Sequence, residues 1–392
     1  MKKYIILAAA AVMALAACTK TEIAPESQRE ISFQVASRLQ TKATGVLYNN
    51  GAFGTYAWFN ATDEFMVNEQ VDKLGSVWKT VDNTFYWPKT GSIDFISYSP
   101  FAGTSNTAGT VPVVTSSKIT YTGLTAGTQD IMYADKVTVA CATGADTDDI
   151  YDNGLAGSTD SGYNGVPTLF RHALAKLSFK IKANFVEYDD ATNGSHTEWE
   201  VTVNSIKISG FKTTGNCELE WESGAWKKPV THVANPNYDA TDPNSVEFFD
   251  CNVWTNLSGT SVAQELLPSG AIVLTTTPQD LNPASGFVMP QILVNDAPSA
   301  PAQKLTMDIH IKTTLSNGKT INEDLVKVVD IKDISSLHAW EMNQNIVYTI
   351  SIKPTAKDTT NGQDNTPEDV VITFDPAVAD WTNVDASATI QL

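Results

Sequence analysis

The sequence has few cysteines and few basic residues for its length. Its four cysteines among 392 residues are Cys18, Cys141, Cys217 and Cys251, and their wide spacing matches neither a disulfide framework nor a zinc site. Lysine and arginine together number 26 against 44 aspartates and glutamates, which gives a formal net charge of −18. Because such an acidic surface repels phosphate backbones, we expect no nucleic-acid partner.

The sequence also lacks the motifs of common enzyme classes. It contains no HExxH, GxSxG, P-loop or GxGxxG pattern, and its five histidines are scattered. His172 stands at the start of an alternating segment and is interpreted as a packed or hydrogen-bonded structural residue. His310 lies on the polar side of such a segment and is interpreted as exposed. We therefore expect no enzymatic activity and no cofactor.

One acidic stretch could collect a hard cation. Asp146, Asp148, Asp149 and Asp152 offer the carboxylate oxygens that Ca²⁺ prefers. Their spacing does not follow the D-x-D-x-D-G loop of known calcium sites. A solvated acidic loop is therefore the favoured interpretation, with a weak calcium site as the alternative.

After its opening segment the chain has no apolar run of the roughly 20 residues that cross a membrane. The opening itself places Lys2 and Lys3 before thirteen apolar residues, 5–17, which is typical of an export signal. The four residues ending at Cys18 read LAAC and resemble the bacterial lipobox. We expect the signal peptide, 1–17, to be removed and lipid on Cys18 to hold the precursor in the outer membrane. An ordinary signal with a chance cysteine is the alternative.

If Cys18 carries lipid, three cysteines remain, so at most one disulfide can form within the chain. The sequence leaves open which of Cys141, Cys217 and Cys251 would pair, and whether any do.

Nearly every other interpretable segment alternates apolar and polar residues with period two. Examples are 31–35, 177–181 and 305–311, and similar patterns occur in "NIVYTISI", "DVVITF" and the closing "SATIQL". Clusters of Gly, Asn, Asp, Thr and Pro separate them, and no long segment has a 3.6-residue apolar repeat. The pattern predicts an all-β protein of β-sandwich type with few short helices.

The least structured stretches are 143–165 and 354–369, and the first is the better candidate for a domain boundary. We place an N-terminal β-sandwich at 43–168 and a C-terminal β-sandwich at 169–392.

Several segments, in their order and spacing, resemble the fimbrillin family of pilin-type surface lipoproteins. They include the lipobox, "ISFQVASRLQTKA", "FYWPKTGSIDFISYSPF", "FRHALAKLSFKI", "WEMNQNIVYTISI" and "ITFDPAVADW". The resemblance implies two tandem transthyretin-like β-sandwich domains. It also implies a structural subunit of a cell-surface fimbria that supports adhesion.

The resemblance further implies a removable strand near the start of the mature chain, within residues 18–42. In such pilins this placeholder fills a groove of the N-terminal domain until a trypsin-like protease cuts behind it. Here Ile31, Phe33 and Val35 would fill the groove, and Arg38 or Lys42 would mark the cut. The family commonly has Thr-Arg-Ala at this point, whereas this chain has Thr-Lys-Ala at 41–43, so the scissile bond stays open.

The vacated groove would then accept a donor strand from the next subunit. At the C-terminus, Ala388, Ile390 and Leu392 alternate with polar residues and would form that donor strand. An ordinary last strand in its own sheet is the alternative. The expected partners are other copies of the chain, other fimbrial subunits, the processing protease, the outer membrane, and a host glycan or protein receptor.

Two other functions fit parts of the sequence. A fimbrial subunit at the tip or the anchor of the fimbria would share the fold. A surface glycan-binding β-sandwich lipoprotein would instead use exposed tryptophans to stack sugars.

Overall fold

The computed structural model describes the chain in segments. These are residues 30–37, 51–75, 77–88, 90–103, 111–141, 165–183, 189–190, 195–196, 198–282, 286–295, 301–314, 318–335, 337–356 and 367–378. The expected lipidation, processing, acidic-loop and donor-strand residues lie outside them, namely Cys18, Arg38, Lys42, Asp146, Asp148, Asp149, Asp152, Ala388, Ile390 and Leu392.

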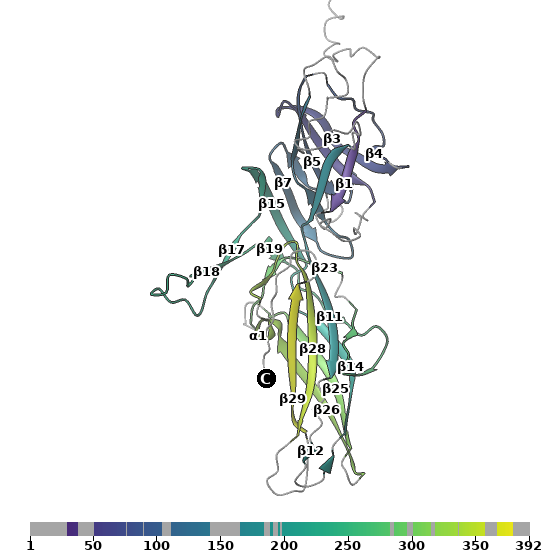
Figure 1. Ribbon diagram of the computed structural model, residues 1–392, viewed down its shortest axis with the longest axis vertical. Helices are drawn as coiled ribbons and strands as arrows, with labels where there is room; N and C mark the ends of the chain where they lie inside the picture. Colours follow the sequence, from purple (N-terminus) through teal and green to yellow (C-terminus); the bar gives the residue numbers. More distant parts are fainter. Residues whose placement is uncertain are drawn as a thin grey trace, which may run out of the picture.

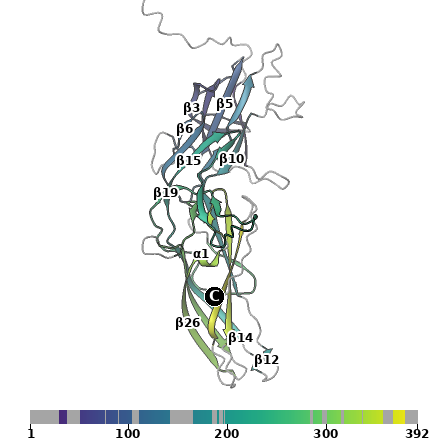
Figure 2. The same ribbon diagram turned by 90° about the vertical axis from the view of Figure 1, so that its left-hand side faces the viewer.

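The molecule is elongated and almost entirely β (Figures 1 and 2). Strands account for 60% of the residues and helix for 1%, and the described part holds a single helical turn, α1 (Ile331–Ile334). The all-β prediction is therefore confirmed. The strands form a ring at one end, a small sheet in the middle and a sandwich of two sheets at the other end.

The first half is a sheet that closes on itself. Seven strands pair in the order β2-β3-β4-β1-β10-β8-β5, and β5 pairs back onto β2 to close the ring, while β9 follows β8 along the same edge of β5. The strands are β1 (Phe33–Ser37), β2 (Phe53–Phe59), β3 (Asp63–Leu74), β4 (Val77–Thr80), β5 (Gly91–Ser99), β8 (Met132–Ala134), β9 (Val137–Cys141) and β10 (Val166–His172).

The middle sheet joins segments that are far apart in the sequence. Its strands are β6 (Val113–Thr115), β7 (Lys118–Thr125), β15 (Thr214–Glu222), β16 (Ala225–Lys227) and β19 (Thr255–Ser258). Because β7 pairs with β15, strand pairing runs across the expected boundary at residue 168. Cys217 lies buried and free in this sheet. The division into domains at 43–168 and 169–392 stays a prediction.

The second half is a sandwich of two sheets. One contains β11 (Ala175–Ala183), β22 (Gln279–Asp280), β23 (Phe287–Val288), β28 (Asn345–Ala356) and β29 (Pro367–Val378). The other contains β14 (Glu198–Ser209), β20 (Gln264–Glu265), β21 (Ile272–Val273), β25 (Lys304–Thr314) and β26 (Thr320–Asp330). The apolar sides of β11 and β25 are buried between the sheets, as their period-two pattern predicts. Short pairs complete this half, namely β12 (Asp189–Asp190) with β13 (Ser195–His196) and β24 (Gln291–Ile292) with β27 (Ala339–Trp340).

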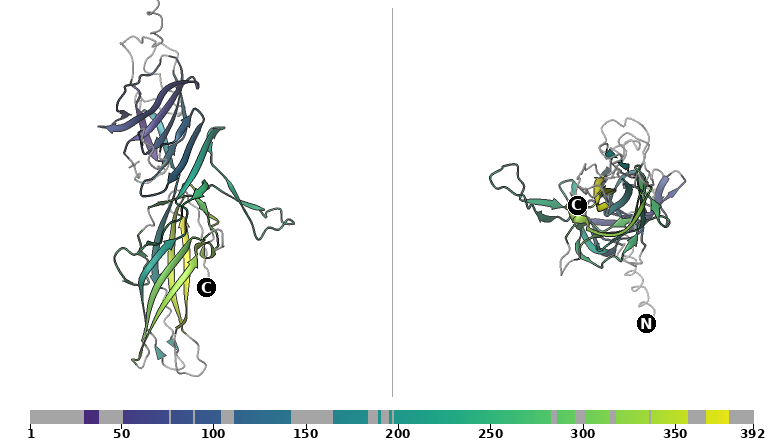
Figure 3. Two further views of the ribbon diagram at one scale, coloured as in Figure 1. Left: turned by 180° about the vertical axis from the view of Figure 1, so that it is seen from behind. Right: turned by 90° about the horizontal axis from the view of Figure 1, so that it is seen from below.

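A two-stranded arm projects sideways from the middle of the molecule (Figures 1 and 3). It consists of β17 (Thr231–Ala234) and β18 (Phe248–Cys251), which pair only with each other among the described strands. At its root the ring of Phe249 stacks on His338, with centroids 3.9 Å and planes 14° apart. Near the root Cys251 is buried and free, and burial raises the pKa of its thiol to about 11. Towards the tip the arm exposes Tyr238 and Phe248.

Candidate functional site: the groove filled by the first strand

The first described strand, β1, closes the ring of the first half (Figure 1). It runs parallel to β10 over five residue pairs, from Phe33 opposite Val166 to Ser37 opposite Phe170. On its other side it pairs antiparallel with β4, where Phe33 faces Trp78. Without β1, both β4 and β10 would present open edges, and an open edge exposes unpaired N–H and C=O groups.

Two hydrogen bonds just before β1 hold the incoming chain on both sides. The Ile31 N–H donates to the Phe85 carbonyl at 2.8 Å, and the Val166 N–H donates to the Ser32 carbonyl at 2.8 Å. Glu30 adds an exposed ion pair with Lys79, whose atoms lie 3.4 Å apart. Exposed pairs of this kind contribute little stability, so the backbone and the apolar side chains hold the strand.

The side chains of this segment fill the centre of the ring. Ile31 is 1% exposed and Phe33 is 2% exposed, while Val35 is half-buried and packs against the same core. The Phe33 ring meets Phe53 and Phe95 edge-on, with centroid distances of 5.6 and 5.8 Å. At about 1.5–3 kcal/mol for each buried side chain, Ile31 and Phe33 together contribute on the order of 3–6 kcal/mol. The edge-on aromatic contacts add to that figure.

The groove is the space between β4 and β10 that β1 fills, and its wall has no room for a side chain at Gly165. This residue has φ +100°, and a Cβ there would lie 2.6 Å from the carbonyl carbon of Phe33 and 2.8 Å from its Cα. Real Cβ atoms do not approach backbone so closely. Glycine is therefore required both for the backbone conformation and for the close passage of β1.

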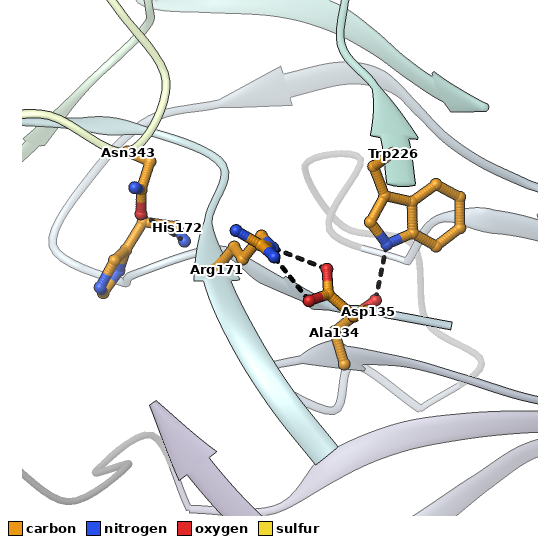
Figure 4. A network of polar contacts seen from close by, with 6 residues as sticks. All are labelled: Ala134, Asp135, Arg171, His172, Trp226 and Asn343. Carbon is orange, nitrogen blue, oxygen red and sulfur yellow. Dashed lines mark hydrogen bonds and ion pairs between the residues drawn. The ribbon is translucent and has the colours of Figure 1, made fainter. Parts of the chain in front are cut away.

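The far end of the groove is bordered by a charged pair. Just beyond Phe170, the Arg171 guanidinium donates to both carboxylate oxygens of Asp135, each at 2.6 Å (Figure 4). This bidentate contact raises the pKa of Arg171. Beside it, the Trp226 indole N–H donates to the Ala134 carbonyl at 2.8 Å. These contacts hold β8 against β10, the strand that forms one wall of the groove.

The described residues contain neither a metal cluster nor an exposed tryptophan. No three His, Cys, Asp or Glu side chains gather there in a way that could hold an ion. Of the eight described tryptophans, five are buried and three are half-buried; they are Trp58, Trp78, Trp87, Trp199, Trp221, Trp226, Trp254 and Trp340. His172 is hydrogen-bonded to Asp130, with Nδ1 and the carboxylate oxygen 2.6 Å apart. This arrangement agrees with the structural role expected of His172.

The sequence pattern identified the strand but not its surroundings. The structure brings Ile31, Phe33 and Val35 together in one core, as the alternation suggests. Gly165 and β10 were missed as walls of the groove, because a parallel pairing between segments so far apart leaves no local pattern. The glycine immediately before the alternating segment 166–170 was the only available signal.

These features define a class of protein. It is an all-β protein whose first ring is completed by the first of its described strands. The fimbrillin-like family profile matches residues 41–381, and the chain belongs to this family. A comparison with curated proteins found no relative.

The chain is similar to several solved structures, and one of them supports the same fold. A fimbrial protein from Bacteroides vulgatus is 15% identical, and the match covers 90% of this chain and 100% of that one with a TM-score of 0.50. A candidate cell adhesion protein from Bacteroides uniformis is 16% identical, with 91% and 98% covered and a TM-score of 0.42. The fimbrial anchor protein Mfa2 from Porphyromonas gingivalis is 8% identical, with 92% and 100% covered and a TM-score of 0.25.

Family membership places the chain among exported cell-surface proteins of a structural, non-enzymatic family. In the described part of the chain, no helix is long and apolar enough to span a membrane.

Replacing Gly165 with alanine should displace β1. The new methyl group would clash with the Phe33 backbone, so we expect Gly165→Ala to lower the free energy of unfolding by about 2 kcal/mol more than a matched control. Hydrogen exchange of residues 30–37 should also become faster. The control is Gly224→Ala, because Gly224 has φ +84° with nothing within 4 Å. Equal effects of the two substitutions would show that β1 does not pass close to Gly165.

Proposed function

We propose that the chain is a structural subunit of a cell-surface fimbria that polymerises by donor-strand exchange and supports adhesion. It would be exported as a lipoprotein precursor with lipid on Cys18 and then cut by a trypsin-like protease. The observation that supports this most directly is the position of β1, which fills the groove between β4 and β10 and pairs with both strands, whereas an edge strand pairs on one side only. A strand from a neighbouring copy could fill the same groove.

The position of the processing residues suits this proposal. Arg38 follows Ser37, the last residue of β1, and Lys42 lies four positions further on. A cut after either residue would separate β1 from the rest of the chain. While the strand is tethered it competes at millimolar effective concentration, and cutting removes this advantage. After proteolysis, a strand from another subunit could therefore replace β1 in the groove.

In the groove, β1 makes aromatic contacts that the proposed donor strand lacks. Phe33 makes two edge-on aromatic contacts, worth about 0.5–1.5 kcal/mol each beyond the area that they bury. The proposed donor residues Ala388, Ile390 and Leu392 are aliphatic and cannot make such contacts. Exchange would therefore depend on removing the tether, not on a better fit of the donor.

The alternatives receive less support. A glycan-binding lipoprotein that stacks sugars on tryptophan would need an exposed indole, and none of the eight described tryptophans is exposed. A tip or anchor subunit remains within the same proposal, because it would share the fold. It would differ in whether it is cut and whether it donates a strand.

Trypsin treatment of the purified precursor tests the proposed function. We expect a new N-terminus between residues 38 and 43, followed by ladders that resist SDS. Ile390→Asp should be cut normally yet form no ladder, because a charge cannot enter an apolar pocket without a large desolvation cost. Thr389→Asp is the matched control and should still form ladders, since in the proposed donor strand its side chain would lie on the opposite face from Ile390. Clean cutting of the unsubstituted chain that yields only monomers would contradict polymerisation by donor-strand exchange.

Truncating Phe33 should loosen the placeholder before any cut. Phe33→Ala removes a buried phenyl group and should lower the free energy of unfolding of the first half by about 3–5 kcal/mol, measured by denaturant unfolding. Cleavage at Arg38 or Lys42 should become faster, because β1 leaves the groove more often. Val35→Ala, at a half-buried site, should cost only about 1 kcal/mol. If the two substitutions have equal effects, the Phe33 pocket does not hold the strand.

A further inference from the structure

One extended piece of backbone, residues 166–183, joins the two halves of the molecule. It forms β10 in the ring and then β11 in the sandwich (Figures 1 and 2). Only Ala173 and Leu174 separate the two strands, and both are fully buried. β10 pairs in parallel with β1, and β11 pairs in parallel with β28 over eight residues. The groove is therefore connected to the main sheet of the other half through this short crossing.

Trp254 clamps the first residue of the crossing. Its indole N–H donates to the Ala173 carbonyl at 2.9 Å, and its ring is buried beside Tyr121, with centroids 5.8 Å apart. On the other side, the Ala173 N–H donates to the Ile131 carbonyl at 2.8 Å. Both polar groups of Ala173 are thus satisfied by segments distant in the sequence, which is unlike a solvated linker.

Asn343 clamps the crossing at two further points. Its backbone N–H donates to the Leu174 carbonyl at 3.0 Å, and its side-chain oxygen accepts a hydrogen bond from the His172 N–H at 3.3 Å (Figure 4). Asn343 has φ 65°, a left-handed conformation that asparagine tolerates better than most residues. The turn before β28 is therefore bonded to both sides of the crossing.

We propose that this crossing is a joint that carries tension between the two halves, with Trp254 and Asn343 as its clamps. The inference rests on the proposed fimbrial role, because a subunit held at both ends experiences tension along its length. The strands on either side run roughly along the long axis of the molecule (Figures 1 and 3). An axial pull therefore shears the β11–β28 ladder and the ladder between β10 and whichever strand fills the groove, and a sheared ladder must break its hydrogen bonds together. At the joint itself, the clamps prevent the two halves from swinging apart.

Constant-force measurement on single full-length chains tests the joint. Handles would be attached at the β2–β3 turn, residues 60–62, and in the connection between β28 and β29. Trp254→Phe keeps a buried ring but removes the bond to Ala173, and we expect the lifetime of the folded chain under force to fall about fivefold or more. Trp226→Phe is the matched control, since Trp226 makes an equally short indole bond to Ala134 away from the crossing. It should shorten the lifetime by less than about twofold.

The two variants should lose similar stability in denaturant, so that only the response to force separates them. Equal shortening of both lifetimes would overturn the proposal. If Trp254→Phe does not fold, Asn343→Gly replaces it, because glycine keeps the positive φ and removes the contact to His172. A lifetime for Asn343→Gly within about twofold of the unsubstituted chain would likewise overturn the proposal. The measurement uses uncut single chains, so its outcome is independent of whether the chain polymerises.

Discussion

The first half of the molecule depends on one strand lying between two others. β1 supplies backbone partners to β10 and β4 and buries Ile31 and Phe33 in the core that those strands surround. Sheets that close in this way have no open edges, which protects them from uncontrolled pairing. The same closure makes the ring sensitive to its first strand, because removing β1 would open two edges and empty an apolar core at once. In our proposal, fimbrial assembly uses this sensitivity.

The alternation of apolar residues was sufficient to predict the all-β fold and a strand near Ile31 to Val35, although the strand in the structure, β1, runs from Phe33 to Ser37. Period-two patterns report which side of a strand is buried, and burial is what the structure finds at Phe33, Leu177 and Ile309. Such patterns contain no information about which strand lies beside which. The parallel pairing of Phe33 with Val166 and the pairing of β7 with β15 therefore required the structure. The need for glycine at Gly165 is visible only once the backbone of Phe33 is placed against it.

The middle of the molecule contains a hydrophobic core that residues from both halves share. Its core combines Trp58 and Tyr133 of the first half with Trp254 and Met342, which follow much later in the chain. Buried indole and amide bonds complete the packing at Ala173 and Leu174. Since these two residues directly follow the wall of the groove, whatever strand fills the groove is connected through β10 to the sandwich. A filament built from such subunits would carry load through hydrogen-bonded strands.

In the proposed assembly, β1 must leave its groove before subunits can join. A reversible lock tests it most directly. Val35 and Thr168 face each other across β1 and β10, and neighbouring strands are close enough for a disulfide. In the double variant Val35→Cys, Thr168→Cys, the oxidised protein should be cut by trypsin but remain monomeric, and reduction should release SDS-resistant ladders. Ladders that form equally well from the oxidised, locked protein would show that β1 need not leave the groove for subunits to join.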